Sequence, residues 1–324
     1  RHISMFLGAD PDSTTFVPNA TTGVNIVLKS LSLRPGDEIV TTDHGYGAVT
    51  LAVNDICART GAVHRVVPLA LAATDTEIVA ELAKAITPDR TRLMIVDQIA
   101  SATARWMPVT AIAETARRSG VPLLVDAAHA PGTVATPIAS IGADYWVGNL
   151  HKWAFSPRPT ALLAVAPHRR AKLVPMVTSW SHEAGFPESF EMGGTLDYTC
   201  WLAAPTGLYV MRTVGVDLIR SHNAALVAYG QRVVGAALGL LAPADLPQPG
   251  SPNAAMRILP LPAGVASSSE AAIQLRTRIA DELHVEVAIT GWRNRRFIRI
   301  AAQIYNHPDE YDRLAAGLPR VLRS

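Results

Sequence analysis

An alternation of short apolar runs and helical patterns between residues 15 and 165 is the feature that most constrains the fold of this chain. The runs typical of strands are 38–42, 63–68, 92–97, 122–127, 144–148 and 161–165. Helical patterns lie between them at 48–60, 76–86 and 109–119, each near the length that a crossover between parallel strands requires. The alternation predicts an α/β fold in which a mainly parallel sheet is sandwiched by helices.

The composition changes around residues 241–262, where six prolines crowd together. We interpret this stretch as the passage from a large domain, residues 1–245, to a smaller α+β domain, residues 246–324. In the smaller domain the patterns predict a helix at 269–283 with Glu270 at its N-terminal cap, strands at 285–290 and 297–304, and a closing helix after Pro308.

Charge and cysteine content limit the classes of function. The 324-residue chain has 49% hydrophobic residues, enough to fill a substantial core. Its 29 basic and 27 acidic residues nearly balance, so we expect neither nucleic acid nor a membrane as a partner. No apolar run approaches the roughly 20 residues that cross a bilayer. Cys57 and Cys200 match neither a metal-ligand spacing nor a disulfide framework, so we expect a cytoplasmic protein without a metal site.

An acid and an amine follow two of the predicted strands, at the point where each strand ends. Asp126 closes the run 122–127, and Lys152 follows the run 144–148, 26 residues beyond Asp126. Ligands bind at the carboxyl ends of the strands in such sheets. This pair suits pyridoxal 5′-phosphate (PLP): lysine holds the aldehyde as a Schiff base, and the acid keeps the pyridine nitrogen protonated. Lys152 is also one of only four lysines in the chain.

Other interpretations of these residues remain open. Asp126 could be a structural hydrogen-bond acceptor, and Lys152 an exposed lysine without a chemical role. A metal site built from Asp126, His129 and His151 fits no familiar ligand spacing. A serine hydrolase requires a G-x-S-x-G elbow between strand and helix, and the sequence has none.

Further candidate positions lie in turns beside the predicted strands. The segment 16–25 reads as a strand end, then hydroxyl side chains and a helix, which can cradle a phosphate or simply cap the helix. After the run 38–42, His44 offers a planar ring for an aromatic cofactor and Tyr46 a proton carrier, or either could merely cap the next helix. Arg299 lies inside an apolar strand pattern, where it needs an anion, either a substrate carboxylate or a protein acid.

Polar side chains near the acid and the amine extend this set. His129 could reach the phenolic oxygen of the cofactor ring, or be an ordinary turn histidine, and Ser101 is a weaker candidate for the same oxygen. Asn149 and His151 flank Lys152 and could donate to the phosphate.

Five short strings occur in order along the chain: PNATT (18–22), TDHGYGA (42–48), VDAAHAPG (125–132), GNLHKW (148–153) and GTLDYT (194–199). Together they resemble the fold-type I PLP enzymes of aminotransferase class V, and most closely the isopenicillin N epimerase-like branch. The resemblance spans residues 16–304. It also implies that the family's N-terminal arm, which helps complete the small domain and the substrate entrance, is absent from this sequence.

The resemblance implies a role for each candidate residue. Lys152 forms the Schiff base, Asp126 pairs with the pyridine nitrogen, His44 stacks on the ring and His129 holds the phenolic oxygen. Arg299 clamps the α-carboxylate of the substrate. The phosphate would be held by Ala20, Thr21, Thr22, Asn149 and His151, and by Thr195 of the other subunit of a homodimer with shared active sites.

We therefore expect a PLP-dependent enzyme in which Lys152 removes the Cα proton of an amino-acid substrate while Asp126 keeps the ring electron-poor. Return of a proton by Tyr46 from the opposite face would make it an epimerase or racemase of secondary metabolism, as in isopenicillin N epimerase. The alternatives are a PLP-dependent C–S β-lyase of the sulfoxide lyase type, or another class V aminotransferase-like activity.

Two further classes of function bear on this sequence. Cysteine desulfurases of this class carry a nucleophilic cysteine that residues 261–272 lack, so we do not expect persulfide-forming sulfur transfer. A non-catalytic binding module that retains the PLP fold is the alternative from another class of function.

Overall fold

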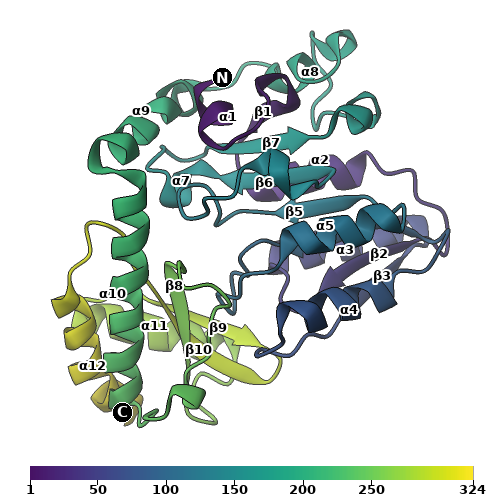
Figure 1. Cartoon of the computed structure of the whole chain (residues 1–324). Coiled ribbons are helices and arrows are strands. Elements are labelled where there is room, and N and C mark those ends of the chain that lie inside the picture. Colours follow the sequence, from purple (N-terminus) through teal and green to yellow (C-terminus); the bar gives the residue numbers. More distant parts are fainter. Residues whose placement is uncertain (324) are drawn as a thin grey trace. The chain divides into compact units, whose positions relative to one another are not determined.

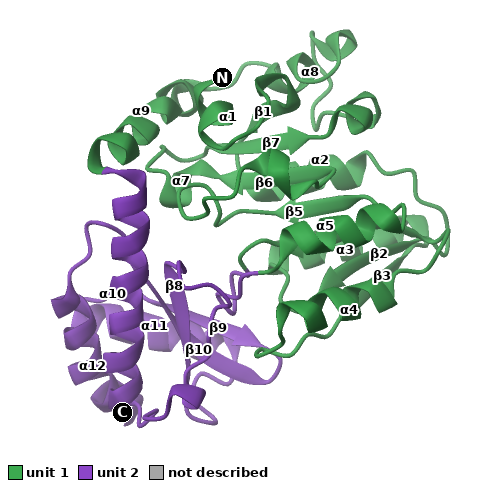
Figure 2. Cartoon of the chain, viewed as in Figure 1, with its two compact units in different colours: residues 1–99, 107–214 green, residues 100–106, 215–324 purple. Residues whose placement is uncertain are grey.

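The computed structural model describes residues 1–323 and divides the chain into two compact units (Figure 2). Unit 1 comprises Arg1–Ile99 and Met107–Val214, and unit 2 comprises Ala100–Trp106 and the chain from Gly215 onward. Sequence composition places a boundary after residue 245, whereas the long helix α10 (Val216–Ala237) already belongs to unit 2. The apolar side chains of α10 pack in the core of unit 2. The positions of the prolines in the sequence give no sign of this packing.

Unit 1 is built on a seven-stranded sheet with the order β1-β7-β6-β5-β4-β2-β3 (Figure 1). Strands β2 to β6 run parallel, whereas β7 is antiparallel to β6 and β1 is antiparallel to β7. The predicted mainly parallel sheet is therefore confirmed. The strands are β1 (Thr14–Val17), β2 (Glu38–Thr42), β3 (Val63–Val67), β4 (Thr91–Asp97), β5 (Leu123–Asp126), β6 (Tyr145–Asn149) and β7 (Ala161–Val165).

Four helices pack in two pairs against this sheet: α2 (Ala20–Lys29) with α3 (Gly47–Thr60), and α4 (Asp75–Ala85) with α5 (Val109–Arg118). Their starts follow ordinary capping chemistry, as in α4, where Thr74 and Glu77 form a reciprocal capping box. The core between α2, α3 and the strands is wholly aliphatic at its centre, with Val24, Ile39 and Leu93 fully buried. This core holds the strand ends, and the turns that follow them, in fixed positions.

Shorter elements complete unit 1. The connection between β6 and β7 holds only α7 (Leu150–Trp153), which is too short for a crossover, so β7 returns antiparallel to β6. The remaining elements are α1 (His2–Phe6), α6 (Ile138–Ile141), α8 (Glu188–Glu191), α9 (Thr199–Val214) and the 3₁₀ turns Pro11–Ser13, Pro167–Lys172 and His182–Ala184.

Unit 2 has an antiparallel three-stranded sheet in the order β8-β10-β9, with three helices. Strand β8 lies inside the proline-rich stretch and was not predicted, because a single five-residue run between prolines gives no clear period. Helix α11 begins where predicted, but Ser268 caps it by accepting from the Ala271 N–H, and Glu270 lies in the first turn. The elements are β8 (Met256–Pro260), β9 (Ala288–Trp292), β10 (Arg295–Ala301), α10, α11 (Ser269–Leu283), α12 (Pro308–Arg323) and a 3₁₀ turn at Pro243–Asp245.

Among residues 1–323, no helix combines the length and the apolar character that spanning a membrane requires.

Candidate active site

Two carboxyl groups lie side by side at the carboxyl ends of neighbouring strands in unit 1. Asp97 closes β4, Asp126 closes β5, and the two are paired in the parallel ladder. Only 6% of Asp97 and 3% of Asp126 are exposed. Asp126 Oδ1 accepts a 3.0 Å hydrogen bond from the Ala128 N–H, and the Asp97 carboxyl accepts one from the backbone N–H of Tyr46. The sheet edge thus carries two buried acids, of which the sequence analysis identified only Asp126.

Burial raises the pKa of both carboxyl groups above the ordinary value of an aspartate. For Asp97 the rise is large, because the charge of Asp126 adds to the effect of burial. For Asp126 the Ala128 N–H and the charge of Lys152 act against burial. Asp126 is therefore the first of the pair to ionise as the pH rises, and Asp97 is the one that keeps its proton.

Lys152 lies in α7, directly after β6, and its amine contacts an imidazole. Lys152 Nζ is 3.2 Å from His129 Nε2, and Nδ1 of the same ring accepts a 3.2 Å hydrogen bond from the Trp153 indole N–H. Because Nδ1 is an acceptor, the neutral imidazole carries its proton on Nε2, on the side of the amine. The structure thus brings together Lys152 and His129, which the sequence analysis placed near one another.

The turn that carries His129 reaches α7 because Gly132 has no side chain. Its φ is +89°, and a Cβ atom there would lie 2.6 Å from the carbonyl oxygen of Trp153. The Thr133 hydroxyl donates to the carbonyl oxygen of His129 and closes the turn. Backbone packing between this turn and α7 therefore sets the distance between His129 and the amine of Lys152.

The first turn of α2 lies against the end of β6. The Ala20 N–H donates a 2.8 Å hydrogen bond to Asn149 Oδ1. The helix approaches the strand this closely because Gly23 packs on Val147, where a Cβ atom would lie 2.5 Å from Val147 Cγ2. Ala20 and Asn149, both predicted to bind a phosphate, are brought together in this way.

Asn19 caps α2 and uses part of its hydrogen-bonding capacity. Its Oδ1 accepts from both the N–H and the hydroxyl of Thr22, at 2.8 and 3.1 Å. Within residues 1–323, the backbone N–H and the hydroxyl of Thr21 make no hydrogen bond. Thr21 therefore keeps two donors available at a helix N-terminus, where the dipole favours an anion.

His151, on α7, is held by the neighbouring strand. Its Nδ1 lies 2.8 Å from the carbonyl oxygen and 3.0 Å from the amide nitrogen of Thr160, and burial lowers its pKa. Its Nε2 makes no hydrogen bond within the described residues. The ring is thus fixed through Nδ1 and leaves Nε2 available.

His44 and Tyr46 lie in the turn after β2 and differ in exposure. The His44 side chain is only 1% exposed, and its Nε2 lies 3.3 Å from the carbonyl oxygen of Leu69. Tyr46 is the N-cap of α3, and 44% of it is exposed. The imidazole is fixed within the turn, whereas the phenol lies at the surface; the stacking and proton-transfer roles stay predictions.

In unit 2, Arg299 and Ser101 contact each other directly. Arg299 Nη1 donates to the carbonyl oxygen of Ser101 at 2.5 Å and to its Oγ at 2.8 Å. The sequence analysis gave these residues separate tasks, a substrate clamp and a cofactor contact, and did not predict that they bind each other. Thr195, in unit 1 before α9, is exposed and forms no hydrogen bond within the described chain.

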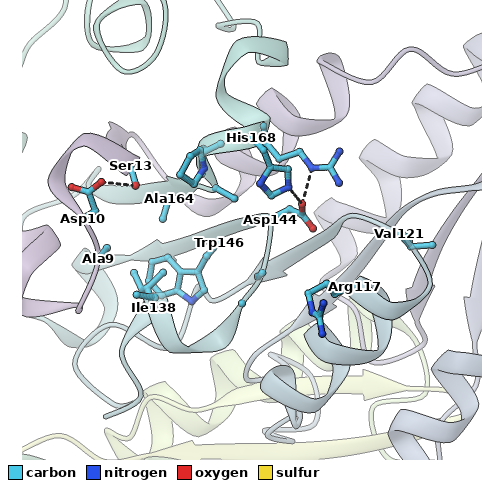
Figure 3. Close-up of a pocket in the computed structure, with 18 residues that line it drawn as sticks. Ala9, Asp10, Ser13, Arg117, Val121, Ile138, Asp144, Trp146, Ala164 and His168 are labelled. Atoms are coloured by element: carbon cyan, nitrogen blue, oxygen red, sulfur yellow. Dashed lines mark hydrogen bonds and ion pairs between the residues drawn. The ribbon is translucent and has the colours of Figure 1, made fainter.

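A cavity of about 430 Å³ lies at the start of β6, whereas Lys152 follows the end of that strand. Figure 3 shows the residues that line this cavity. Trp146 forms part of its wall, and Asp144 accepts hydrogen bonds from Arg169 Nε at 2.6 Å and from His168 Nε2 at 3.0 Å. None of the candidate site residues lines it. This cavity is therefore separate from the carboxyl ends of the parallel strands.

Comparison with known proteins defines the class of this chain. Its residues 1–314 match the model of the aminotransferase class-V family. The chain is 29% identical to an isopenicillin N epimerase of Streptomyces clavuligerus, over 98% of this chain and 82% of that protein. It is also 29% identical to a probable L-cysteine desulfhydrase, chloroplastic, of Arabidopsis thaliana, over 96% of this chain and 71% of that protein.

A solved structure has the same fold: the cystine C-S lyase C-DES in complex with its reaction product cysteine persulfide. It aligns with a TM-score of 0.79 at 21% identity, over 99% of this chain and 84% of that one. The chain belongs to the aminotransferase class-V family, and its cofactor is pyridoxal 5′-phosphate.

The residues at the strand ends fit this cofactor. A buried carboxyl group, an amine beside an imidazole, and the unused donors of Thr21 at the N-terminus of α2 supply what a pyridinium nitrogen, an aldehyde and a phosphate require. Asp97 is the residue that sequence reasoning missed. Its signal was present, because two neighbouring parallel strands both end in aspartate, but only one of them is followed by the family string.

Proposed function

We propose that this chain acts on the Cα–H bond of an amino-acid substrate and that its activity is epimerisation or racemisation. The observation that carries the proposal is the position of Lys152 Nζ, 3.2 Å from His129 Nε2 and on the helix that follows β6, the strand beside the one that Asp126 closes. PLP, when bound, supplies an electron-accepting ring that stabilises negative charge at Cα.

Each side chain has one task in this proposal. Lys152 would hold the aldehyde carbon of the cofactor until the amine of the substrate displaces it. The freed Nζ then takes the proton from Cα. The Asp126 carboxylate holds a proton on the pyridine nitrogen, and it stays anionic because Asp97 takes the proton of the pair. The His129 Nε2–H orients the amine and the phenolic oxygen.

The remaining residues bind and orient. Thr21 and His151 donate to the phosphate, supported by Ala20, Thr22 and Asn149, while His44 bounds the ring. Arg299, fixed by Ser101, binds the α-carboxylate of the substrate. Tyr46 gives its own phenolic proton to Cα from the face opposite Lys152, while the proton taken from Cα stays on Lys152 Nζ. Its exposed phenol makes no hydrogen bond through its hydroxyl in the described chain.

C–S β-lysis is the second candidate. It is favoured by the names of relatives, since L-cysteine desulfhydrases and a cystine C-S lyase are among them. The same removal of the Cα proton would then expel a thiol from Cβ. The absence of cysteine from residues 261–272 gives this route no protein thiol at that place to take up sulfur.

Deuterium incorporation separates the two candidates. The PLP-loaded enzyme is incubated in deuterated water with a panel of L-amino acids that includes cysteine and an S-substituted cysteine. Inverted configuration with deuterium at Cα and no pyruvate supports the epimerase. Pyruvate with a released thiol or sulfide contradicts the epimerase and supports the lyase. If no amino acid of the panel gains deuterium at Cα and none yields pyruvate, the proposed chemistry at Cα is wrong.

We also propose a homodimer in the cytoplasm, with Thr195 reaching the phosphate of the other subunit. The support is a set of exposed apolar side chains between residues 180 and 209, the stretch that contains Thr195 and the start of α9, since gathered exposed apolar side chains mark interaction surfaces. They include Trp180, which is 96% exposed, Leu202, which is 80% exposed, and Met192, Leu196 and Tyr209. Light scattering at several concentrations tests it, and a monomer at micromolar concentration would contradict it.

A further inference from the structure

A half-buried arginine in unit 2, Arg257, has no carboxylate partner within the described residues. Arg257 on β8 donates from Nη1 to Gln231 Oε1 at 3.0 Å and to Gln248 Oε1 at 3.1 Å. Its Nε is buried and has no hydrogen-bond partner. Within residues 1–323 it forms no ion pair with a carboxylate. A half-buried cation that contacts only neutral amides gains from a nearby anion.

A second arginine adds positive charge at the same place. Arg232 on α10 forms no ion pair within the described residues, and its Cζ lies 5.8 Å from the centre of the Tyr229 ring. Burial, and then the charge of Arg232, lower the pKa of Arg257. Two guanidinium groups therefore repel each other here.

The position of Arg257 is fixed by a fully buried amide. Gln231 is 2% exposed, and its Nε2 donates to the carbonyl oxygens of Pro247 and Ile258, at 3.0 and 2.9 Å. Both of its amide hydrogens are used, so its Oε1 faces Arg257 and cannot turn away. The guanidinium is held in place before any ligand arrives, which reduces the entropic cost of binding.

Both arginines line a cavity of about 390 Å³ built only from unit 2 residues. Its other walls are mostly apolar and include Ala236, Leu240 and Leu246. No acidic residue lines it. A cavity with two cations and apolar walls matches an organic anion better than an inorganic one, because the apolar walls gain only from an apolar body.

We propose that this cavity binds a small organic anion, with an oxyanion group on Arg232 and Arg257 and an apolar body against α10 and the 3₁₀ turn at Pro243–Asp245. The oxyanion is a carboxylate or a phosphate monoester, since the planar guanidinium takes either one through paired hydrogen bonds. The site is made without Lys152, Asp126 or Arg299, so it is distinct from the proposed catalytic residues.

Calorimetric titration of the PLP-loaded enzyme tests the proposal, with octanoate, phenyl phosphate, 1-octanol and inorganic phosphate as probes. We expect saturable binding of octanoate or phenyl phosphate at one site per chain, and the stronger of the two identifies the oxyanion. Octanol and inorganic phosphate should each bind at least about tenfold more weakly, because each lacks one half of the recognition. Binding of neither organic anion would overturn the proposal, as would equal binding of octanol.

Substitutions locate the binding. Arg232→Met changes an exposed side chain whose one printed contact is the Tyr229 ring, which methionine can still touch, so the fold should persist. The affinity should fall at least about tenfold. Arg257→Lys tests the second cation while keeping its charge, and should weaken binding of the planar carboxylate most. The control Arg276→Met removes an exposed arginine paired with Glu286 and should change nothing. Persistence of binding in Arg299→Ala is expected, and its loss there would assign the anion to the substrate site instead.

Discussion

Asp97 and Asp126 occupy paired positions at the ends of β4 and β5, so two buried carboxyl groups share one sheet edge. Because like charges in a buried setting oppose each other, one member of such a pair holds a proton while the other ionises. The Tyr46 N–H reaches Asp97, whereas Asp126 accepts from Ala128. Through this contact Asp97 also ties the turn of His44 to the sheet.

The raised pKa of Asp97 predicts how stability depends on pH. In the unfolded chain Asp97 titrates near its usual value of 3.8, and in the folded chain it titrates at higher pH. The folded chain therefore binds more protons in this interval, so the free energy of unfolding should fall as the pH rises through it. Asp97→Asn keeps an acceptor for the Tyr46 N–H and should flatten this fall. Thermal unfolding of the cofactor-free protein from acidic to neutral pH measures it, and an equal slope in both proteins would refute the assignment.

Lys152→Ala should reduce turnover by about 10²-fold to 10⁴-fold or more, because it removes both the covalent anchor and the proton acceptor. The fold should persist, since α7 is a single turn and alanine favours helix. Lys172→Ala is the matched control, because Lys172 is exposed and lies in a 3₁₀ turn outside the site. Turnover at the wild-type rate in the Lys152 variant would remove the mechanism.

Gly132→Ala should destabilise the protein more than Gly142→Ala. Both glycines have positive φ, +89° and +78°, so each substitution costs about 1–2 kcal/mol in backbone conformation. Only at position 132 does the added Cβ meet backbone, 2.6 Å from the Trp153 carbonyl oxygen, whereas nothing lies within 4 Å at position 142. Chemical denaturation compares the two. Equal loss of stability would mean that contact between the His129 turn and α7 is not tight.

Trp153→Phe should preserve packing while removing the donor to His129 Nδ1. We expect a loss of about 0.5–1.5 kcal/mol in stability. The imidazole should also populate both tautomers, which ¹⁵N chemical shifts of His129 report directly. Trp180→Phe, at a side chain that is 96% exposed, is the control. A single unchanged tautomer in the Trp153 variant would show that the indole does not set it.

Arg299→Ala should raise KM by about tenfold to a hundredfold, as expected for a lost charge-assisted contact to a substrate carboxylate. Its kcat should change much less. Arg295 lies on the same strand, but its side chain is exposed and contacts the Phe297 ring. Arg295→Ala should therefore leave KM unchanged. An unaltered KM in the Arg299 variant would assign that residue to the structural contact with Ser101 alone.

Strand and helix periods in unit 1 were readable from the sequence because each buried strand is a short aliphatic run bounded by turn residues. The ends of 38–42 and 161–165 match β2 and β7. The antiparallel direction of β7 could not be predicted from the sequence, because it depends on the short connection through α7. Strand β8 and the membership of α10 in unit 2 depend on tertiary packing. The local spacing of apolar residues in the sequence does not reveal such packing.

For the candidate site, the sequence predicted single positions but not the contacts between distant segments. The ends of predicted strands located Asp126 and Lys152, and the turn after Asp126 located His129. The structure places His129 beside Lys152. Contacts between distant segments were beyond the sequence, as with Arg299 and Ser101, which lie 198 positions apart. Asp97 was overlooked because a pattern of strand ends does not reveal which two strands pair.

The attachment point of the cofactor tests the account most directly. The PLP-loaded enzyme is reduced with borohydride, digested and sequenced by mass spectrometry. We predict a single modified peptide with the added mass on Lys152, and none in the Lys152→Ala variant. Modification at another lysine, or an enzyme that turns over substrate with no modified peptide, would contradict the central claim.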